Sequence, residues 1–224
     1  MPHLARKHQL TSSLLYHIYN RGNAKSKIFH NTKDYERFMV ILSAYAKRNE
    51  LRIYHWVLMP NHYHLLLELD EPRKLSSIMA GIGRSYVHYH HKTYQSAGHL
   101  WQDRFKSQPV DKEMYLLACG RYIERNPVKA KIVRYAEDYA YSSAAYYVSG
   151  KDDALTQGNL LFDSFESQSS QRREEYKEFL RDFDQEEEEL FVDLEYPQGS
   201  KEFVNRLIKK KGLFLPRRRG RPSK

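Results

Sequence analysis

The sequence is poor in the residues that form disulfides, chain breaks and membrane spans. Its 224 residues include one cysteine, Cys119, which excludes an intrachain disulfide and a zinc site built from several cysteines. Only 10 glycines and 8 prolines are present, so most of the chain should form helices and strands. No apolar run approaches the roughly 18 residues that cross a bilayer, and no apolar signal-peptide stretch begins the chain. We therefore expect a cytoplasmic protein with no membrane partner.

Aromatic residues and positive charge, in contrast, are abundant. The 18 tyrosines and 10 phenylalanines are enough to build a substantial core. The net charge of +9 is uneven, with +10 in residues 1–150, −10 in residues 151–200 and +9 in residues 201–224. Two basic segments separated by an acidic one indicate a polyanionic partner such as nucleic acid. A solvated basic surface explains the same charge equally well.

The pattern of apolar residues predicts an α+β fold. Helical periodicity begins at Asn31 and returns in two later segments, near residues 74–94 and 111–125. Alternating or β-branched segments predict strands near residues 14–20, 52–58, 62–69 and 104–110. This order predicts a ferredoxin-like or RRM-like antiparallel sheet with helices on one face and one added helix.

The composition also predicts four regions along the chain. They are a globular domain at 1–149, a polar linker at 150–168, a helical extension at 169–212 and a basic tail at 213–224. The tail has too few apolar residues to form a packed core, so it should be disordered when free.

Two histidines near the third expected strand are candidate metal ligands. His62 and His64 flank Tyr63, and residues two apart on a strand point to the same face. Two imidazoles on one face can chelate a divalent metal, although two packed or surface histidines are the commoner meaning of this dipeptide. His88 and His90 have the same spacing in a helical segment, where two positions span roughly 200°. That second pair cannot share a metal.

A tyrosine and an asparagine lie one turn apart on the last helix of the domain. Tyr122 and Asn126 are four residues apart and therefore share a side of the helix. A phenol has an ordinary pKa of about 10, so it needs a metal-polarised phosphate to act as a nucleophile. Tyr115 shares the same face and is an alternative. Asn126 could instead end the helix before Pro127.

Three segments together resemble a known family. They read WVLMPNHYHLLLEL, GHLWQDRFKS and YLLACGRYIERNPVKAKIV, in that order. They resemble the single-tyrosine HUH transposases, and most closely the REP-associated tyrosine transposases, over about residues 12–148. The resemblance implies a metal-dependent endonuclease that nicks and rejoins single-stranded DNA at palindromic repeats. A 5′-phosphotyrosine intermediate would link the two steps.

The resemblance assigns roles to individual residues. It makes His62 and His64 metal ligands and Tyr122, rather than Tyr115, the nucleophile. Asn126 stands where such transposases often have a longer glutamine ligand, so its ligand role is the less certain one. The implied cofactor is Mg²⁺ or Mn²⁺, and manganese suits mixed imidazole and oxygen ligands better. The other functions to weigh are a noncatalytic hairpin-binding protein and a phosphodiesterase that uses water.

The expected partner is single-stranded or hairpin DNA. Proteins bind single strands with basic grooves and stacking aromatic rings. The candidate contacts are Arg21, Lys25, Trp101, Arg104, Phe105, Lys106, Arg121, Arg125, Arg217, Arg218, Arg219 and Arg221. The last four form a tail that resembles minor-groove AT-hook peptides or a nonspecific phosphate-binding segment. A monomer or a homodimer is expected, with a slight preference for the monomer.

Overall fold

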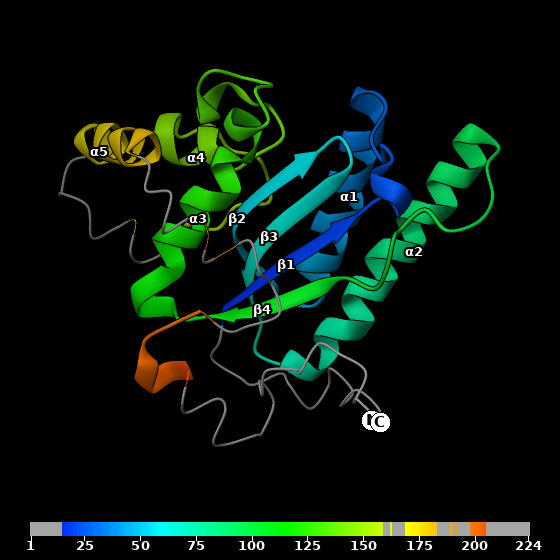
Figure 1. The fold of residues 1–224 in the computed structure, drawn as a ribbon, viewed down its shortest axis with the longest axis horizontal. Coiled ribbons are helices and arrows are strands. Elements are labelled where there is room, and N and C mark those ends of the chain that lie inside the picture. The colour runs from blue at the N-terminus through cyan, green and yellow to red at the C-terminus, as the bar shows by residue number, and fades with distance from the viewer. Residues whose placement is uncertain are drawn as a thin grey trace, which may run out of the picture.

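The computed structural model describes residues 15–158, 162, 169–182, 189, 191 and 198–204. The strands are β1 (Leu15–Arg21), β2 (Arg52–Met59), β3 (His62–Glu68) and β4 (Lys106–Val110). The helices are α1 (Thr32–Arg48), α2 (Leu75–Tyr94), α3 (Lys112–Lys129), α4 (Ala144–Ser149) and α5 (Ser169–Arg181) (Figure 1). Short 3-10 turns occur at η2 (Asn23–Lys25), η3 (Pro72–Lys74) and η4 (Ala136–Asp138). In this part of the chain, no helix has the length and apolar character needed to cross a membrane.

The strands form one antiparallel sheet in the order β2-β3-β1-β4. The order of strands and helices along the chain and the ferredoxin-like topology are therefore confirmed. β1 occupies an inner position between β3 and β4. Tyr19 of β1 lies opposite His64 on one side and opposite Lys106 on the other. One step along β1, His17 lies opposite Gln108 of β4.

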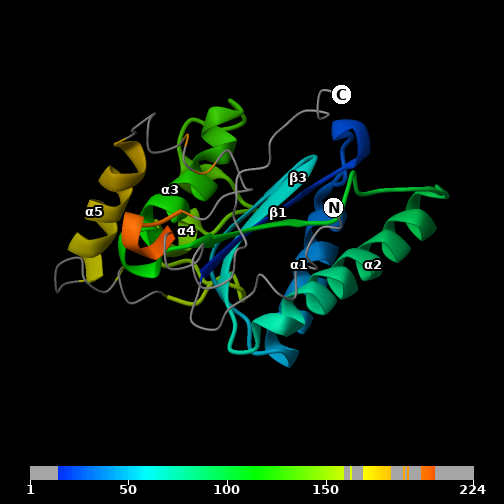
Figure 2. The ribbon, with the colours of Figure 1, turned by 60° about the horizontal axis from the view of Figure 1, so that its bottom comes forward.

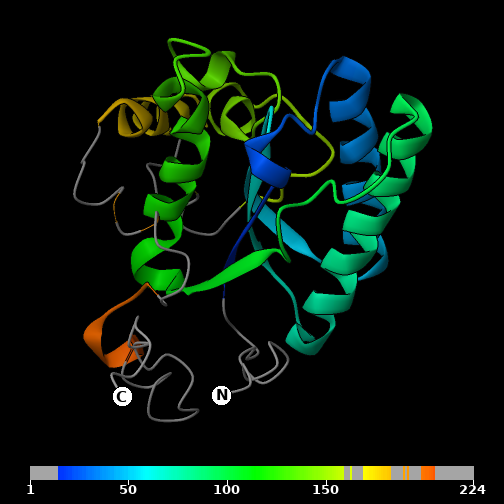
Figure 3. The same ribbon diagram turned by 45° about the vertical axis from the view of Figure 1, so that its right-hand side comes forward.

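Helices cover both faces of this sheet (Figures 2 and 3). On one face, Ile18 and Leu65 pack with Phe38 of α1 in a large apolar core that also includes α2. On the other face, Leu66 packs with Ile123 of α3. The expectation of helices on one face holds for α1 and α2. It omitted α3, which covers the second face and brings its side chains over β1, β2 and β3.

The helix α3 continues beyond Asn126, the residue that could instead have ended it before Pro127. Pro127 lies inside the helix, in its last turn. The missing proline N–H leaves the carbonyl of Ile123 without its usual helical donor. The side-chain amide of Asn126 supplies a substitute, since its Nδ2 lies 3.2 Å from that carbonyl and 2.8 Å from the carbonyl of Tyr122. Asn126 therefore supports the helix at the proline instead of ending it.

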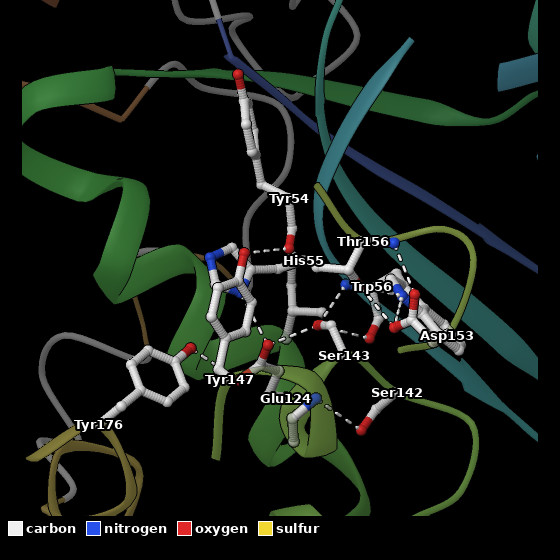
Figure 4. A network of polar contacts seen from close by, with 12 residues as sticks. Tyr54, His55, Trp56, Glu124, Ser142, Ser143, Tyr147, Asp153, Thr156 and Tyr176 are labelled. Atoms are coloured by element: carbon white, nitrogen blue, oxygen red, sulfur yellow. Dashed lines mark hydrogen bonds and ion pairs between the residues drawn. The ribbon is translucent and has the colours of Figure 1, made fainter. Parts of the chain in front are cut away.

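A buried polar network joins α3 to its neighbours (Figure 4). Glu124 of α3 is fully buried, and one of its carboxylate oxygens lies 2.8 Å from Nδ1 of His55 on β2. The same carboxylate accepts hydrogen bonds from Ser143 at 2.5 Å and from Tyr176 of α5 at 2.8 Å. Four segments distant in sequence therefore meet at one carboxylate. This network fixes α3 against the sheet and α5 against α3.

The expected linker is partly folded onto the sheet. The indole Nε1 of Trp56 donates to Asp153 at 3.1 Å and to Thr156 at 2.9 Å, and Leu155 is buried in the α1 and α2 core. The backbone of Thr156 also bridges to β2 at Ile53. The segment was expected to be a linker because its residues are polar, and two of these polar groups accept hydrogen bonds from the indole of buried Trp56. Residues 159–161 and 163–168 lie outside the described part of the chain.

Candidate active site

The two histidines of β3 lie together as strand alternation predicts. His64 is buried and His62 is half-buried on the sheet face that α3 covers. Their ring centroids are 5.2 Å apart and the rings are nearly perpendicular, at 84°. Nδ1 of His62 lies 2.6 Å from Oδ1 of Asn61, in the turn between β2 and β3. A hydrogen bond from Nδ1 to this oxygen leaves Nε2 of His62 with its lone pair.

The second histidine pair, His88 and His90, lies on a helix that directs the two side chains to different sides. On α2, His88 is exposed whereas His90 is buried. The Nε2 of His90 lies 3.3 Å from Nε2 of His30. The prediction that these two histidines do not share a site is confirmed.

Tyr122 lies over the β3 histidines. Its ring is 5.7 Å from the ring of His64, edge-on at 87°, and 5.7 Å from the ring of His17 on β1. Phe191 packs against the tyrosine at 5.7 Å. The ammonium of Lys129 lies 6.0 Å from the tyrosine ring centroid. The half-buried phenol is thus held between the sheet histidines and an aromatic cover.

The alternative tyrosine lies nearer the start of the same helix. Tyr115 is seven residues earlier than Tyr122, which is about 10 Å along a helix axis. Its ring packs 6.3 Å from that of Phe191. The ring contacts with His17 and His64 thus belong to Tyr122.

Asn126 lies beside the histidines. Its side-chain nitrogen donates to the two helix carbonyls, which leaves the amide oxygen for the hydrogen bond between Asn126 and His62. Burial lowers the pKa of His62 to about 4, and hydrogen bonding with Asn126 partly opposes that decrease. Asn126 therefore supports its own helix and also presents an oxygen at the site.

A third histidine was missing from the candidates. His17 of β1 is fully buried, and its Nε2 lies 2.8 Å from Nδ1 of His64. On its other side, Nδ1 of His17 lies 3.3 Å from Oε1 of buried Gln108. Neither residue carries a local motif. They meet His64 through the register in which β1 pairs with β3 and β4, and local sequence patterns do not specify that register.

Burial keeps these imidazoles neutral. It lowers the pKa of His17 to about 4, opposed in part by the hydrogen bond with Gln108. Burial, with smaller effects of the neighbouring His17 and His62, also places the pKa of His64 well below its ordinary value. A neutral imidazole retains the lone pair that a metal ligand needs.

The donor set fits a small divalent cation with open positions. The described residues contain no group of three or more histidine, cysteine or acidic side chains that can hold a metal. Two imidazoles and the amide oxygen of Asn126 are the donors gathered at this point of the sheet. Such a mixed nitrogen and oxygen set suits Mn²⁺, or Mg²⁺ that keeps water and phosphate ligands.

Basic side chains border the same face. Arg21 lies opposite His62 in the strand register and donates from Nε to Gln102 at 2.5 Å. Exposed Lys106 lies opposite Tyr19, whose ring packs 4.8 Å from that of His64. Lys25 is exposed in the turn after β1. Arg21 and Lys106 thus place positive charge at the edge of the histidine site.

A groove lies beyond this edge, between α2 and the segment before β4. Its volume is about 1050 Å³, and its lining includes Trp101, Arg104, Arg84 and His88. Arg104 is exposed and Trp101 is half-buried, with its indole donating to the carbonyl of Gly83 at 3.3 Å. The groove combines cations with an aromatic surface.

Several expected DNA contacts are not available as predicted. Phe105, Arg121 and Arg125 pack or bond within the fold, and the four tail arginines lie outside the described residues. Phe105 borders the groove but is buried in the α1 and α2 core, because the segment before β4 folds back over α2. Arg121 donates to the carbonyls of Phe179 and Asp182, and Arg125 donates to that of Leu180 at 2.6 Å. Both arginines therefore stabilise the negative C-terminal end of α5. The tail residues Arg217, Arg218, Arg219 and Arg221 lie outside the described part of the chain.

Similar chains among the solved structures include the following two, of which the first shares this fold. The first is a REP-associated tyrosine transposase bound to a REP hairpin and is 20% identical, with a TM-score of 0.56. The match covers 71% of this chain and 93% of the other. The second is a putative transposase from Deinococcus radiodurans R1, 20% identical, with a TM-score of 0.36, over 56% of this chain and 89% of the other. No curated protein matches the chain.

A family model gives the more specific result. The model described as "Transposase IS200 like" matches residues 10–126, which is more than half of the 224 residues. The match includes both β3 histidines, Tyr122 and Asn126. The chain belongs to the IS200-like transposase family.

Proposed function

We propose that this transposase nicks and rejoins single-stranded DNA beside a hairpin, with Tyr122 as the nucleophile. The observation that carries the proposal is the position of Tyr122, whose ring lies 5.7 Å from that of His64 on the face shared by His62. A phosphate placed between the phenol and these imidazoles would lie within reach of both. A hydroxyl and a metal-binding set facing one point is the arrangement that covalent phosphodiester cleavage needs.

His62, His64 and the amide oxygen of Asn126 would hold Mg²⁺ or Mn²⁺. When bound, the cation would act as a Lewis acid toward the scissile phosphate and stabilise the charge that develops on it. The neutral state of the buried histidines supports this role, because burial lowers the pKa of His62 to about 4. Arg21 and Lys106 would hold the flanking phosphates.

The chemical step is an exchange of one phosphodiester for another. The Tyr122 oxygen forms a bond to phosphorus while the bond from phosphorus to the 3′ oxygen breaks. The phenolic proton passes to solvent, and the departing 3′ oxygen becomes a hydroxyl. The product is a 5′-phosphotyrosine that a 3′-hydroxyl can reverse, so rejoining needs no external energy source. Phe191, which covers the tyrosine ring at 5.7 Å, would help exclude the water that competes with rejoining.

DNA would bind along the basic edge and into the groove beside α2. Trp101 offers a stacking surface, while Arg84 and Arg104 offer charge for the backbone. A structural relative is a transposase bound to a REP hairpin, which supports a hairpin as the substrate class for this chain too. The Glu124 network holds α3, and with it Tyr122, on its own sheet, which favours an active monomer.

The test is a covalent adduct. The full chain would be incubated with Mn²⁺ and a pool of end-labelled hairpin oligonucleotides whose single-stranded flanks are randomised. A denaturation-resistant protein–DNA adduct should form and should be absent in Tyr122→Phe. Tyr115→Phe is the matched control and should retain the adduct.

The pattern of products separates this function from the other two. Cleavage without an adduct would replace the proposal with a phosphodiesterase that uses water. Binding without cleavage would replace it with a noncatalytic hairpin-binding protein. An adduct lost only in Tyr115→Phe would overturn the choice of nucleophile.

A further inference from the structure

A line of three buried side chains runs across the sheet behind the candidate metal site. Gln108 of β4, His17 of β1 and His64 of β3 lie on adjacent strands and on the same face. Oε1 of Gln108 lies 3.3 Å from Nδ1 of His17, and Nε2 of His17 lies 2.8 Å from Nδ1 of His64. The exposed fractions of Gln108 and His17 are 0%, and that of His64 is 3%, so solvent does not complete these bonds.

The acceptor oxygen of Gln108 determines which nitrogen donates in each hydrogen bond of the series Gln108, His17 and His64. A carbonyl oxygen only accepts, so Gln108 requires the proton of His17 to be on Nδ1. A neutral imidazole with its proton on Nδ1 accepts at Nε2. His64 must then donate from its own Nδ1, which leaves the lone pair on Nε2 of His64. The reversed line would put a proton on that Nε2 and block it as a ligand.

We infer that His17 and Gln108 are positioning residues that select the metal-binding tautomer of His64 and fix the orientation of its ring. The inference rests on the proposed role of His64 as a ligand. Metal-ligating histidines usually donate their second N–H to a nearby acceptor, which fixes the tautomer and the ring direction. Here the acceptor is another imidazole, and its own direction is set one strand further away by an amide.

Geometry argues against simple space filling. The rings of His17 and His64 are stacked at 5.0 Å with an angle of 25°, yet they are offset so that two nitrogens meet at 2.8 Å. An apolar residue of similar volume would keep the packing and remove the acceptor. A glutamine at position 17 would keep an acceptor oxygen close to the place of Nε2. These two substitutions therefore separate packing from hydrogen bonding.

The first experiment reads the tautomer directly, without metal or DNA. Nitrogen-15 NMR of the metal-free full chain at neutral pH should show His64 protonated on Nδ1 and unprotonated on Nε2. His17→Met and Gln108→Met should shift this pattern toward the other tautomer, whereas His17→Gln should retain it. A proton on Nε2 of His64 in the unsubstituted chain would overturn the inference, and so would an unchanged pattern in His17→Met.

The second experiment measures Mn²⁺ binding by titration calorimetry. Loss of a partner behind a ligand typically weakens metal binding about 10- to 100-fold, which is the decrease expected for His17→Met. His17→Gln should bind close to the unsubstituted chain, and thermal unfolding without metal should show all variants folded. Equal Mn²⁺ affinity in His17→Met and the unsubstituted chain would overturn the inference.

One further variant separates failure of the inference from failure of the proposed function. His64→Ala should lose Mn²⁺ binding. If it does and His17→Met binds normally, the metal site stands and the positioning role falls. If the unsubstituted chain and His64→Ala bind Mn²⁺ alike, the proposed ligand role falls with its positioning, whatever tautomer the NMR shows.

Discussion

Two histidine sites lie on the two flanks of α3, and they differ in the partners of their imidazoles. Near Tyr122, His62 contacts Asn61 and His64 is linked through His17 to Gln108, so the partners end in amides. We call this the amide-bound site. Near Glu124, His55 lies 2.8 Å from a carboxylate that also accepts from Tyr176. We call this the carboxylate-bound site.

The difference separates the proposed active site from a structural one. A buried carboxylate beside an imidazole satisfies its charge internally, so the carboxylate-bound site has little to offer a ligand. Amides orient imidazoles without adding charge, so the amide-bound site keeps its capacity for a cation and a phosphate. One helix therefore serves both purposes. It is anchored on one flank at Glu124 and presents Tyr122 on the other.

The largest expected effect comes from removing a proposed metal ligand in the amide-bound site. His64→Ala should reduce formation of the DNA adduct below detection, because the proposed metal site would lose one of its two imidazole ligands. The loss should exceed the roughly 10- to 100-fold that follows from disturbing a residue behind a ligand. The measurement is adduct yield on a denaturing gel, with Mn²⁺ binding measured in parallel. Adduct formation at an unchanged rate would show that His64 is not part of the site.

At the carboxylate-bound site, by contrast, a substitution should mainly lower the stability of the protein. Glu124→Ala removes the acceptor for His55, Ser143 and Tyr176 and should cost about 3–5 kcal/mol of unfolding free energy, as breaking a buried pair does. Chemical denaturation measures this cost. Glu124→Gln, which keeps the shape and one acceptor oxygen, should lose less. A cost for Glu124→Ala below about 1 kcal/mol, the range of exposed pairs, would contradict an anchoring role.

Local patterns predicted the parts of the fold and site that depend on one element. Strand alternation placed His62 and His64 on one face, and helical geometry separated His88 from His90. Tyr122 could not be chosen among 18 tyrosines by spacing alone, and the resemblance was needed to choose it. Strand alternation and helical geometry can be read from a residue and its immediate neighbours, whereas the choice of Tyr122 cannot.

Contacts between distant segments were not predictable from such patterns. His17 and Gln108 join the amide-bound site through the register in which β1 pairs with β3 and β4, which periodicity does not encode. Arg121 and Arg125 were expected to contact DNA. Their real partners are carbonyls of α5, and nothing in their own helix indicates that α5 docks there. Positive charge on a helix therefore predicts an anion partner without saying whether it is DNA or a helix end.

A smaller effect should sharpen the account of how α3 fits the sheet. A methyl group on Gly120 would lie 2.6 Å from Nε2 of His55, whose ring is buried. Gly120→Ala should therefore cost about 1–3 kcal/mol, as overpacking a core does. Gly83→Ala on α2 is the matched control, since its methyl would lie 3.5 Å from the indole of Trp101.

The control should behave differently because its methyl makes only an ordinary contact. Gly83→Ala should be neutral or stabilise the protein by up to about 1 kcal/mol, because alanine is the better helix former. Chemical denaturation of both variants measures the contrast. Equal stability of Gly120→Ala and Gly83→Ala would mean that a methyl group at position 120 does not clash with His55.

The smallest effect is expected at the second histidine tripeptide, and its smallness is informative. His88 is exposed on α2, and the tripeptide His88-Tyr89-His90 has the same sequence as His62-Tyr63-His64. His88→Ala should change the unfolding free energy by no more than about 0.5 kcal/mol, as surface substitutions do. It should also leave Mn²⁺ affinity unchanged, because its helix turns it away from His90. Because His88 borders the groove, a modest loss of hairpin affinity without loss of metal binding would agree with a DNA contact. A loss of Mn²⁺ binding equal to that of His64→Ala would show that the tripeptide itself, and not the strand that carries His64, makes the metal site.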